Sequence, residues 1–267
     1  MKFKLLILIA AFSFLFSCSS DSNGDNGNSI ETNYLPLAIG DYWTYDVTTN
    51  AQTLRDSLYV SNDTTINAKT YKKFKTKNLP MGFFSNSLNN NGLRKEVNSL
   101  LLTGSLALDF GVGVAIDLNV NDFVIFNETA ANNQQLGFVS GTINQTVGTY
   151  PLVIDYTLKS IAIETLPTYS SNGQVYTDVK RVKTIFNAKI TTTVTVQGFP
   201  IPVTITILDP QDVVVSNQYY AKNIGMVYTN TTINYNLNAL PGGATLPIPS
   251  SGSQTQEEFL VNYNVTN

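Results

Sequence analysis

Short runs of alternating polar and β-branched or aromatic residues fill most of this chain, and turn-forming Asn, Gly, Asp and Pro separate them. A period of two places successive side chains on opposite faces of a strand, whereas the helical period of about 3.6 is hard to find after residue 30. The clearest example is Thr191–Leu208, TTTVTVQGFPIPVTITIL, in which two Thr-rich strands flank a Gly/Pro turn. We expect its Thr side to be solvated and its Val and Ile side to be buried. The sequence therefore predicts an all-β, mainly antiparallel fold.

The alternation sets the expected strands, and turn residues set their ends. The strands are Asp41–Thr49, Asp56–Ser61, Thr70–Lys77, Leu93–Val97, Leu100–Thr103, Val114–Leu118, Asp122–Asn127, Leu152–Ile163, Val175–Lys183, Phe186–Val196, Val203–Leu208, Val213–Ala221, Met226–Tyr235 and Glu258–Val265. Turns are expected at Asn98-Ser99, Asn172-Gly173, Gly198-Phe199-Pro200 and Asp209-Pro210. Alternation looks the same in a curved sheet and in two packed sheets. A half-barrel and a sandwich therefore both remain open.

The N-terminal residues have the pattern of a secretory signal. Lys2 and Lys4 precede an uncharged, mostly apolar run from Leu5 to Phe16, which is too short to span a bilayer as a helix. The sequence Leu15-Phe16-Ser17-Cys18 resembles a bacterial lipobox, and Cys18 is the only cysteine. We expect residues 1–17 to be a signal peptide and Cys18 to carry acyl chains such as palmitate, which anchor it in a membrane. A plain secretory signal with a chance cysteine is the alternative.

Two domain boundaries follow from composition. Residues 18–33 include SSDSNGDNGNS, which contains no apolar residue and is expected to be a flexible tether. Residues 34–267 then form the β-rich domain. Within it, PLAIGDYWTYD (Pro36–Asp46) aligns with DLNVNDFVIFN (Asp117–Asn127), and NAKTYKKFK (Asn67–Lys75) aligns with NGQVYTDVK (Asn172–Lys180). These alignments are typical of two repeated halves, 34–110 and 111–267, or of convergent strand chemistry.

The single tryptophan, Trp43, lies in the first of these segments. It is either part of an exposed binding platform or a core residue of the first strand. Trp43, Tyr45 and Val47 share one face of that strand, and the aligned second segment has Val124 in place of Trp43. An apolar replacement suits a core position, so we expect Trp43 to be buried.

Two motifs resemble those of a group of Bacteroidota outer-membrane lipoproteins. These are a Pro-Leu-x-x-Gly-x-x-Trp-x-Tyr element and a later Tyr-x-Ala-x-x-x-Gly-x-Val segment. The matching residues are Pro36, Leu37, Gly40, Trp43 and Tyr45, then Tyr219, Ala221, Gly225 and Val227. The resemblance implies an outer-membrane location, and some relatives resemble the half-barrel lipid carriers of lipoprotein sorting. Those carriers pair their sheet with helices, which this sequence does not show.

The chain contains no histidine, which removes the usual general base and the commonest zinc ligand. A carboxylate pair, as in glycosidases, would still be available. The candidates Asp109, Asp117, Asp122, Glu128, Asp155 and Glu164 occur in no recognisable motif. The glycines of FGVGVAI (Phe110–Ile116) favour a bend in a strand over a dinucleotide loop, because no third glycine follows. We therefore predict no catalytic residue, no metal site, no cofactor and no enzymatic activity.

Charge and anchoring together limit the partners. Removing Lys2 and Lys4 from the 16 Lys and Arg leaves 14 against 19 Asp and Glu, which disfavours nucleic acid. We expect a lipid-anchored protein of the outer membrane, on its periplasmic side or at the cell surface. Its role would be structural or interactive, with an envelope protein, lipid or glycan as partner. The alternative is a module that binds a hydrophobic ligand or a glycan. An apolar cavity would favour the lipid, and an exposed planar aromatic row the glycan.

Overall fold

A computed structural model describes residues 33–266, except residues 51, 110–114, 196–201 and 241–245. The expected signal peptide, Cys18 and residues 18–32 of the tether lie outside the described residues, as do 110–114 of the glycine segment. Among the described residues, no helix has both the length and the apolar character needed to cross a bilayer.

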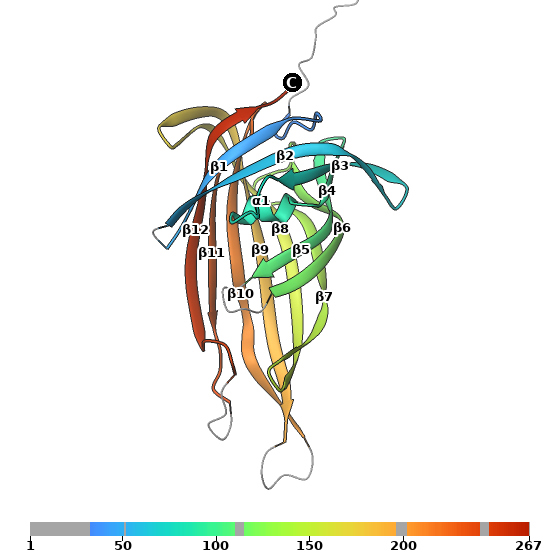
Figure 1. Cartoon of the computed structure of the whole chain (residues 1–267), viewed down its shortest axis with the longest axis vertical. Coiled ribbons are helices and arrows are strands. Elements are labelled where there is room, and N and C mark those ends of the chain that lie inside the picture. The colour runs from blue at the N-terminus through green and yellow to red at the C-terminus, as the bar shows by residue number, and fades with distance from the viewer. Residues whose placement is uncertain (1–32, 51, 110–114, 196–201, 241–245, 267) are drawn as a thin grey trace, which may run out of the picture. The chain divides into compact units, whose positions relative to one another are not determined.

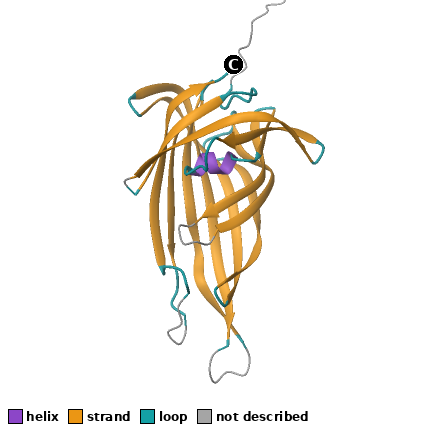
Figure 2. Ribbon diagram, viewed as in Figure 1, coloured by secondary structure: helices purple, strands orange, loops and turns teal. Residues whose placement is uncertain are grey.

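Twelve strands of the described residues form one antiparallel sheet, which curves until it is nearly closed as a half-barrel (Figures 1 and 2). The elements are β1 (Tyr42–Thr49), β2 (Gln52–Ile66), β3 (Lys69–Thr76), α1 (Phe83–Leu88), β4 (Gly92–Glu96), β5 (Ser99–Asp109), β6 (Ala115–Asn127), β7 (Gln135–Val147), β8 (Tyr150–Ser171), β9 (Gln174–Val194), β10 (Val203–Ala221), β11 (Gly225–Asn236) and β12 (Ser251–Asn264). Their order in the sheet is β6-β5-β4-β3-β2-β1-β12-β11-β10-β9-β8-β7. The all-β prediction is confirmed, and of the two architectures left open by the sequence the structure has the curved sheet and not the sandwich.

Strand β1 shows how alternation produces the buried face. Trp43, Tyr45 and Val47 are buried, while the intervening Thr44 and Asp46 are only half-buried. The predicted burial of Trp43 is thus confirmed. The two strands of TTTVTVQGFPIPVTITIL are likewise confirmed as parts of β9 and β10, in which Val194 faces Val203. The expected turn at Gly198-Phe199-Pro200 lies outside the described residues.

The expected turn at Asp209-Pro210 is wrong, because β10 continues through it. The pairing of β10 with β9 skips between Leu208 and Gln211, which places Pro210 in a β-bulge. Pairing of β10 with β11 begins only at Val214. Pro210 therefore lies where its missing N–H interrupts no ladder.

Two elements were not expected from the sequence. Strand β7 has the sequence QLGFVSGTINQTV, in which polar and glycine residues hide the alternation. Helix α1 contains only six residues, too few to show a helical period. The sequence showed no helix, and α1 makes that expectation wrong.

The two aligned motifs occupy partly equivalent places. Asn67-Ala68 and Asn172-Gly173 both have positive φ and both join consecutive antiparallel strands, β2–β3 and β8–β9. The other pair of segments belongs to β1 and β6, which are five antiparallel pairings apart and so run in opposite directions. Two repeated halves remain a prediction.

The seam of the half-barrel lies between β6 and β7, the two ends of the strand order. Ser160 of β8 connects the two edges: its hydroxyl donates a hydrogen bond to the carbonyl of Val124 and accepts one from the N–H of Gly137, at 2.9 Å. A Cβ at Gly137 would lie 2.6 Å from the Val124 carbonyl oxygen. The close approach of the two edges therefore requires glycine there.

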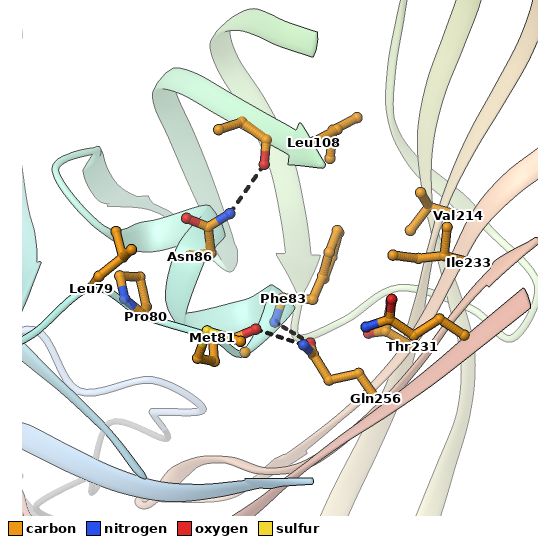
Figure 3. Close-up of a pocket in the computed structure, with 13 residues that line it drawn as sticks. Leu79, Pro80, Met81, Phe83, Asn86, Leu108, Val214, Thr231, Ile233 and Gln256 are labelled. Atoms are coloured by element: carbon orange, nitrogen blue, oxygen red, sulfur yellow. Dashed lines mark hydrogen bonds between the residues drawn. The ribbon is translucent and has the colours of Figure 1, made fainter. Parts of the chain in front are cut away.

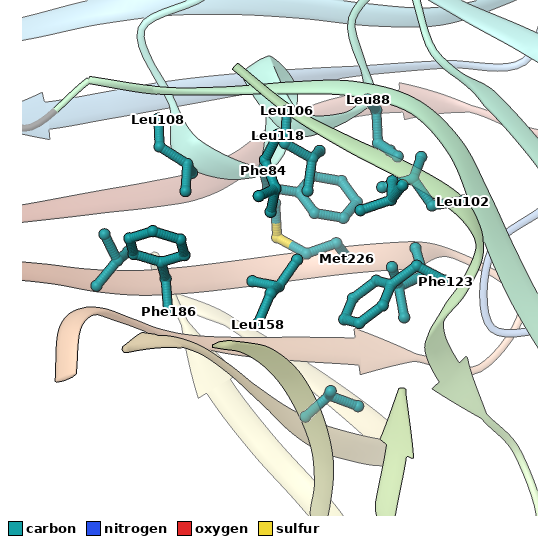
Figure 4. Packing of buried hydrophobic residues seen from close by; sticks show 14 of the residues in the cluster. Phe84, Leu88, Leu102, Leu106, Leu108, Leu118, Phe123, Leu158, Phe186 and Met226 are labelled. Carbon is teal, nitrogen blue, oxygen red and sulfur yellow. The ribbon is translucent and has the colours of Figure 1, made fainter. Parts of the chain in front are cut away.

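Helix α1 lies on the concave side of the sheet and fills part of its interior (Figure 1). Phe84 and Leu88 are buried there, and Figure 4 shows both among the core side chains. Phe84 contacts Tyr45 and Tyr220 edge-on, with ring centroids 6.2 and 6.0 Å apart. The helix thus joins β1 to the opposite wall.

Candidate functional site

A pocket of about 300 Å³ lies inside the half-barrel, between α1 with β5 on one side and β10–β12 on the other (Figure 3). Its apolar lining includes Leu79, Met81, Phe83, Leu108, Val214 and Ile233. Its polar lining includes Asn86, Thr231, Gln254 and Gln256. This volume is at the lower end of the range typical of small-molecule sites, about 300–1,000 Å³.

One wall of the pocket is the segment before α1, which two β-strand side chains hold in place. The Asp56 carboxylate of β2 accepts hydrogen bonds from the N–H groups of Met81, at 3.0 Å, and Gly82, at 2.7 Å. The Gln256 side chain of β12 accepts from the N–H of Phe83 at 2.6 Å and donates to the carbonyl of Met81. The segment is therefore fixed although α1 has no capping side chain of its own.

Glu258 continues this arrangement from the next inward position of β12. Its carboxylate accepts a hydrogen bond from the N–H of Phe84 at 2.7 Å and from the hydroxyl of Ser85 at 3.3 Å. Glu258 is fully buried, and this burial raises its pKa to about 7, with the Asp56 charge adding to the effect. The hydrogen bonds from Phe84 and Ser85 act in the opposite direction.

The described lining of the pocket contains no ionisable side chain. Asp56 and Glu258 lie behind the α1 segment, where they bind its backbone. The pocket can therefore hold an apolar molecule and offer it a few neutral hydrogen-bonding groups. A smaller apolar void of about 40 Å³, lined among others by Ile116, Ile190 and Leu237, lies elsewhere between the walls.

The carboxylates singled out in the sequence do not form this site. Asp122 instead binds the guanidinium of Arg94 at 2.8 Å and the hydroxyl of Tyr71 at 2.6 Å. These hydrogen bonds, that of Arg94 first, hold the pKa of Asp122 well below its usual range. Asp155 binds Thr142, and Glu164 pairs with Arg181. Asp117 and Glu128 do not line the pocket, and the side chain of Asp109 lies outside the described residues.

Sequence reasoning missed Asp56, Gln256 and Glu258 as site residues. Their only signal is strand alternation: Gln254, Gln256 and Glu258 share the inward face of β12. A strand whose inward positions are amides and a carboxylate must have polar partners inside, and here those partners are the backbone N–H groups before and within α1.

The outer face carries a row of aromatic side chains, which bears on glycan binding. Tyr169, Tyr219, Tyr228 and Phe259 are half-buried and belong to β8, β10, β11 and β12. Tyr169 and Tyr219 stack with their ring centroids 4.3 Å apart and their planes 16° apart, so each ring covers one face of the other. A sugar needs an open ring face to stack on. The other neighbouring rings of the row are tilted to each other by 32°, 46° and 40°, so the four side chains do not form the single plane expected of a glycan platform.

Among the described residues, no group of three or more Asp or Glu side chains is placed to hold a metal ion. The pocket thus remains the candidate functional site. Comparisons of the chain with models of known protein families, with curated proteins and with solved structures give no match.

Proposed function

We propose that this chain is an envelope lipoprotein, anchored through Cys18, whose half-barrel binds a small hydrophobic or amphipathic ligand in the pocket beside α1. The signal-like N-terminus and the lipobox-like sequence support the anchor. The observation that carries the binding role is the pocket of about 300 Å³ with its largely apolar lining. Compared with a purely structural role, binding accounts for an interior that packing leaves partly empty.

The test is binding of N-phenyl-1-naphthylamine, an uncharged probe that fluoresces in apolar surroundings. The protein is the full chain with Cys18→Ser, which removes the acylation site. Substitution Ile233→Trp fills the pocket from β11, and we expect it to weaken probe binding by about tenfold or more.

The matched control is Thr232→Trp, because Thr232 is the exposed neighbour of Ile233 on the same strand. It should bind the probe as the parent does. Equal binding by the two variants, or no binding by the parent, contradicts the proposal and favours the structural or interaction role.

A further inference from the structure

The volume of the pocket limits the ligand to one chain. About 300 Å³ is the lower limit for small-molecule sites. The apolar side chains of the lining come from both walls, with Leu108 of β5 on one side and Val214 and Ile233 on the other (Figure 3). An unbranched alkyl chain fits between these walls, whereas a lipid with two long chains exceeds the volume.

Three polar side chains of the lining each donate one hydrogen bond to a neighbouring group. The side-chain nitrogen of Gln254 donates to the hydroxyl of Thr49 at 2.9 Å, and that of Asn86 donates to the carbonyl of Ala107 at 3.0 Å. The Thr231 hydroxyl donates to that of Ser216 at 2.8 Å. The side-chain oxygens of Gln254 and Asn86 have no donor among the described residues. Each of the two amides thus keeps its oxygen and one N–H, so the pocket can both accept from and donate to a head group such as a hydroxyl or an amide.

Charge decides against an anionic head group. The described lining has no Lys or Arg, so a carboxylate or phosphate would lose water without gaining a cation. The Asp56 carboxylate, which holds the adjacent segment, adds negative charge nearby. No carboxylate in the described lining is available to pair with a cationic head group either.

From these three observations we infer that the ligand is an uncharged single-chain amphiphile, with a hydroxyl or amide head that bonds the side-chain amide of Gln254 or that of Asn86. This inference rests on the proposed function, since it concerns the same pocket. On this inference a free fatty acid of the same chain length binds less tightly, because the described lining has no cation to pair with its carboxylate.

The experiment is displacement of N-phenyl-1-naphthylamine from the Cys18→Ser chain by 1-decanol or by decanoate, at a pH where decanoate is ionised. We expect decanol to displace the probe at a concentration at least about tenfold lower than decanoate. Decanol is also less soluble in water than decanoate, which by itself favours its binding. The deciding measurement is therefore how the ratio of the two displacing concentrations changes when a cation is added to the pocket.

Substitution Gln254→Lys supplies that cation inside the pocket, and Thr255→Lys supplies it on the exposed neighbouring position. We expect Q254K to improve decanoate binding by about tenfold relative to decanol, and T255K to leave the ratio unchanged.

The outcomes separate the two proposals. If decanoate matches decanol in the parent chain, or if Q254K behaves as T255K does, the inferred head group is overturned and the pocket remains a binding site. If the probe binds and neither amphiphile displaces it, the ligand class is overturned. If the parent does not bind the probe, the proposed function itself fails.

Discussion

Trp43 ties together strands that are distant in the chain. Its indole N–H donates to the carbonyl of Ile224 at 2.6 Å, across 181 residues, and its ring stacks on Phe74. A Cβ at Gly225, which has φ of 117°, would lie 2.7 Å from the indole nitrogen. The tryptophan of the first motif and the glycine of the second therefore need each other: only glycine leaves room for the ring at the start of β11.

A second residue is held in an unfavourable backbone conformation. Val97, in the turn between β4 and β5, has φ of 52° and is 83% exposed. A β-branched residue with positive φ is strained, whereas Asn tolerates it. We expect Val97→Asn to raise the free energy of unfolding by about 1 kcal/mol, as measured by urea denaturation.

The control is Val175→Asn, because Val175 of β9 is also an exposed valine but does not have a positive φ. It should give no gain. A V97N chain no more stable than the parent, or a V175N chain stabilised to the same extent, contradicts the account.

For apolar residues, strand alternation predicts well which side chains lie on the buried face. Trp43 could be placed inside because alternation and the aligned Val124 agree. The burial of Asp56 and Glu258 could not be predicted, because acidic residues in strands are usually exposed. Only the insertion of α1 gives their carboxylates donors, and a contact between β2, β12 and a six-residue helix leaves no local pattern.

Helix α1 is the element on which the interior depends. Its first N–H groups donate to Gln256 and Glu258, and the N–H groups of the segment before it donate to Asp56. Isolated helices of this length are unstable in water, so these contacts and the packing of Phe84 and Leu88 must hold it in place. The pocket exists because the helix fills only part of the space.

The Glu258 carboxylate should make stability depend on pH. Its pKa is about 7 in the folded chain against 4.5 normally, so the folded state binds the proton more tightly. Stability is then greatest at low pH and falls as the pH rises from about 4.5 to about 7. Glu258→Gln keeps an acceptor for Phe84 but does not titrate. We expect its free energy of unfolding, relative to that of the parent, to increase by about 2–3 kcal/mol when the pH is raised from about 5 to about 8.

Urea denaturation at both pH values measures this gain. The control is Glu257→Gln, the same change at the neighbouring outward position of β12. A difference between E258Q and the parent that is identical at the two pH values would show that Glu258 does not titrate in this range.

Across the whole molecule, alternation could predict strands and their antiparallel order but could not decide how the sheet closes. Curvature depends on β-bulges such as those at Thr44/Tyr45, Val60/Asn62 and Leu208/Gln211, where one strand gains residues over its partner. A bulge changes no composition, so the half-barrel and the sandwich look alike in sequence. The pocket, formed between opposite walls of the curved sheet, was equally beyond prediction.

The position of the seam has a consequence for folding kinetics. Every pairing in the sheet joins strands consecutive in the chain except β1 with β12, which must find each other across most of the chain. Pairings between distant residues slow folding, because the loop must close before the contact forms. The break in the sheet, by contrast, lies between consecutive strands, β6 and β7.

A circular permutant would make β1 and β12 consecutive in the chain and would place its new ends at the break between β6 and β7. If the chain begins at Asn133, ends at Asn132 and joins the old ends near Asn33 and Thr266 by a short linker, every strand pairs with its neighbour in sequence. We expect its refolding, followed by stopped-flow fluorescence of Trp43, to be faster than that of the parent, while the sheet stays the same. An equal or slower rate would mean that β1 and β12 are not the last strands to meet. On this account the sheet is completed only when β12 pairs with β1, the strand that precedes all the others in the native order.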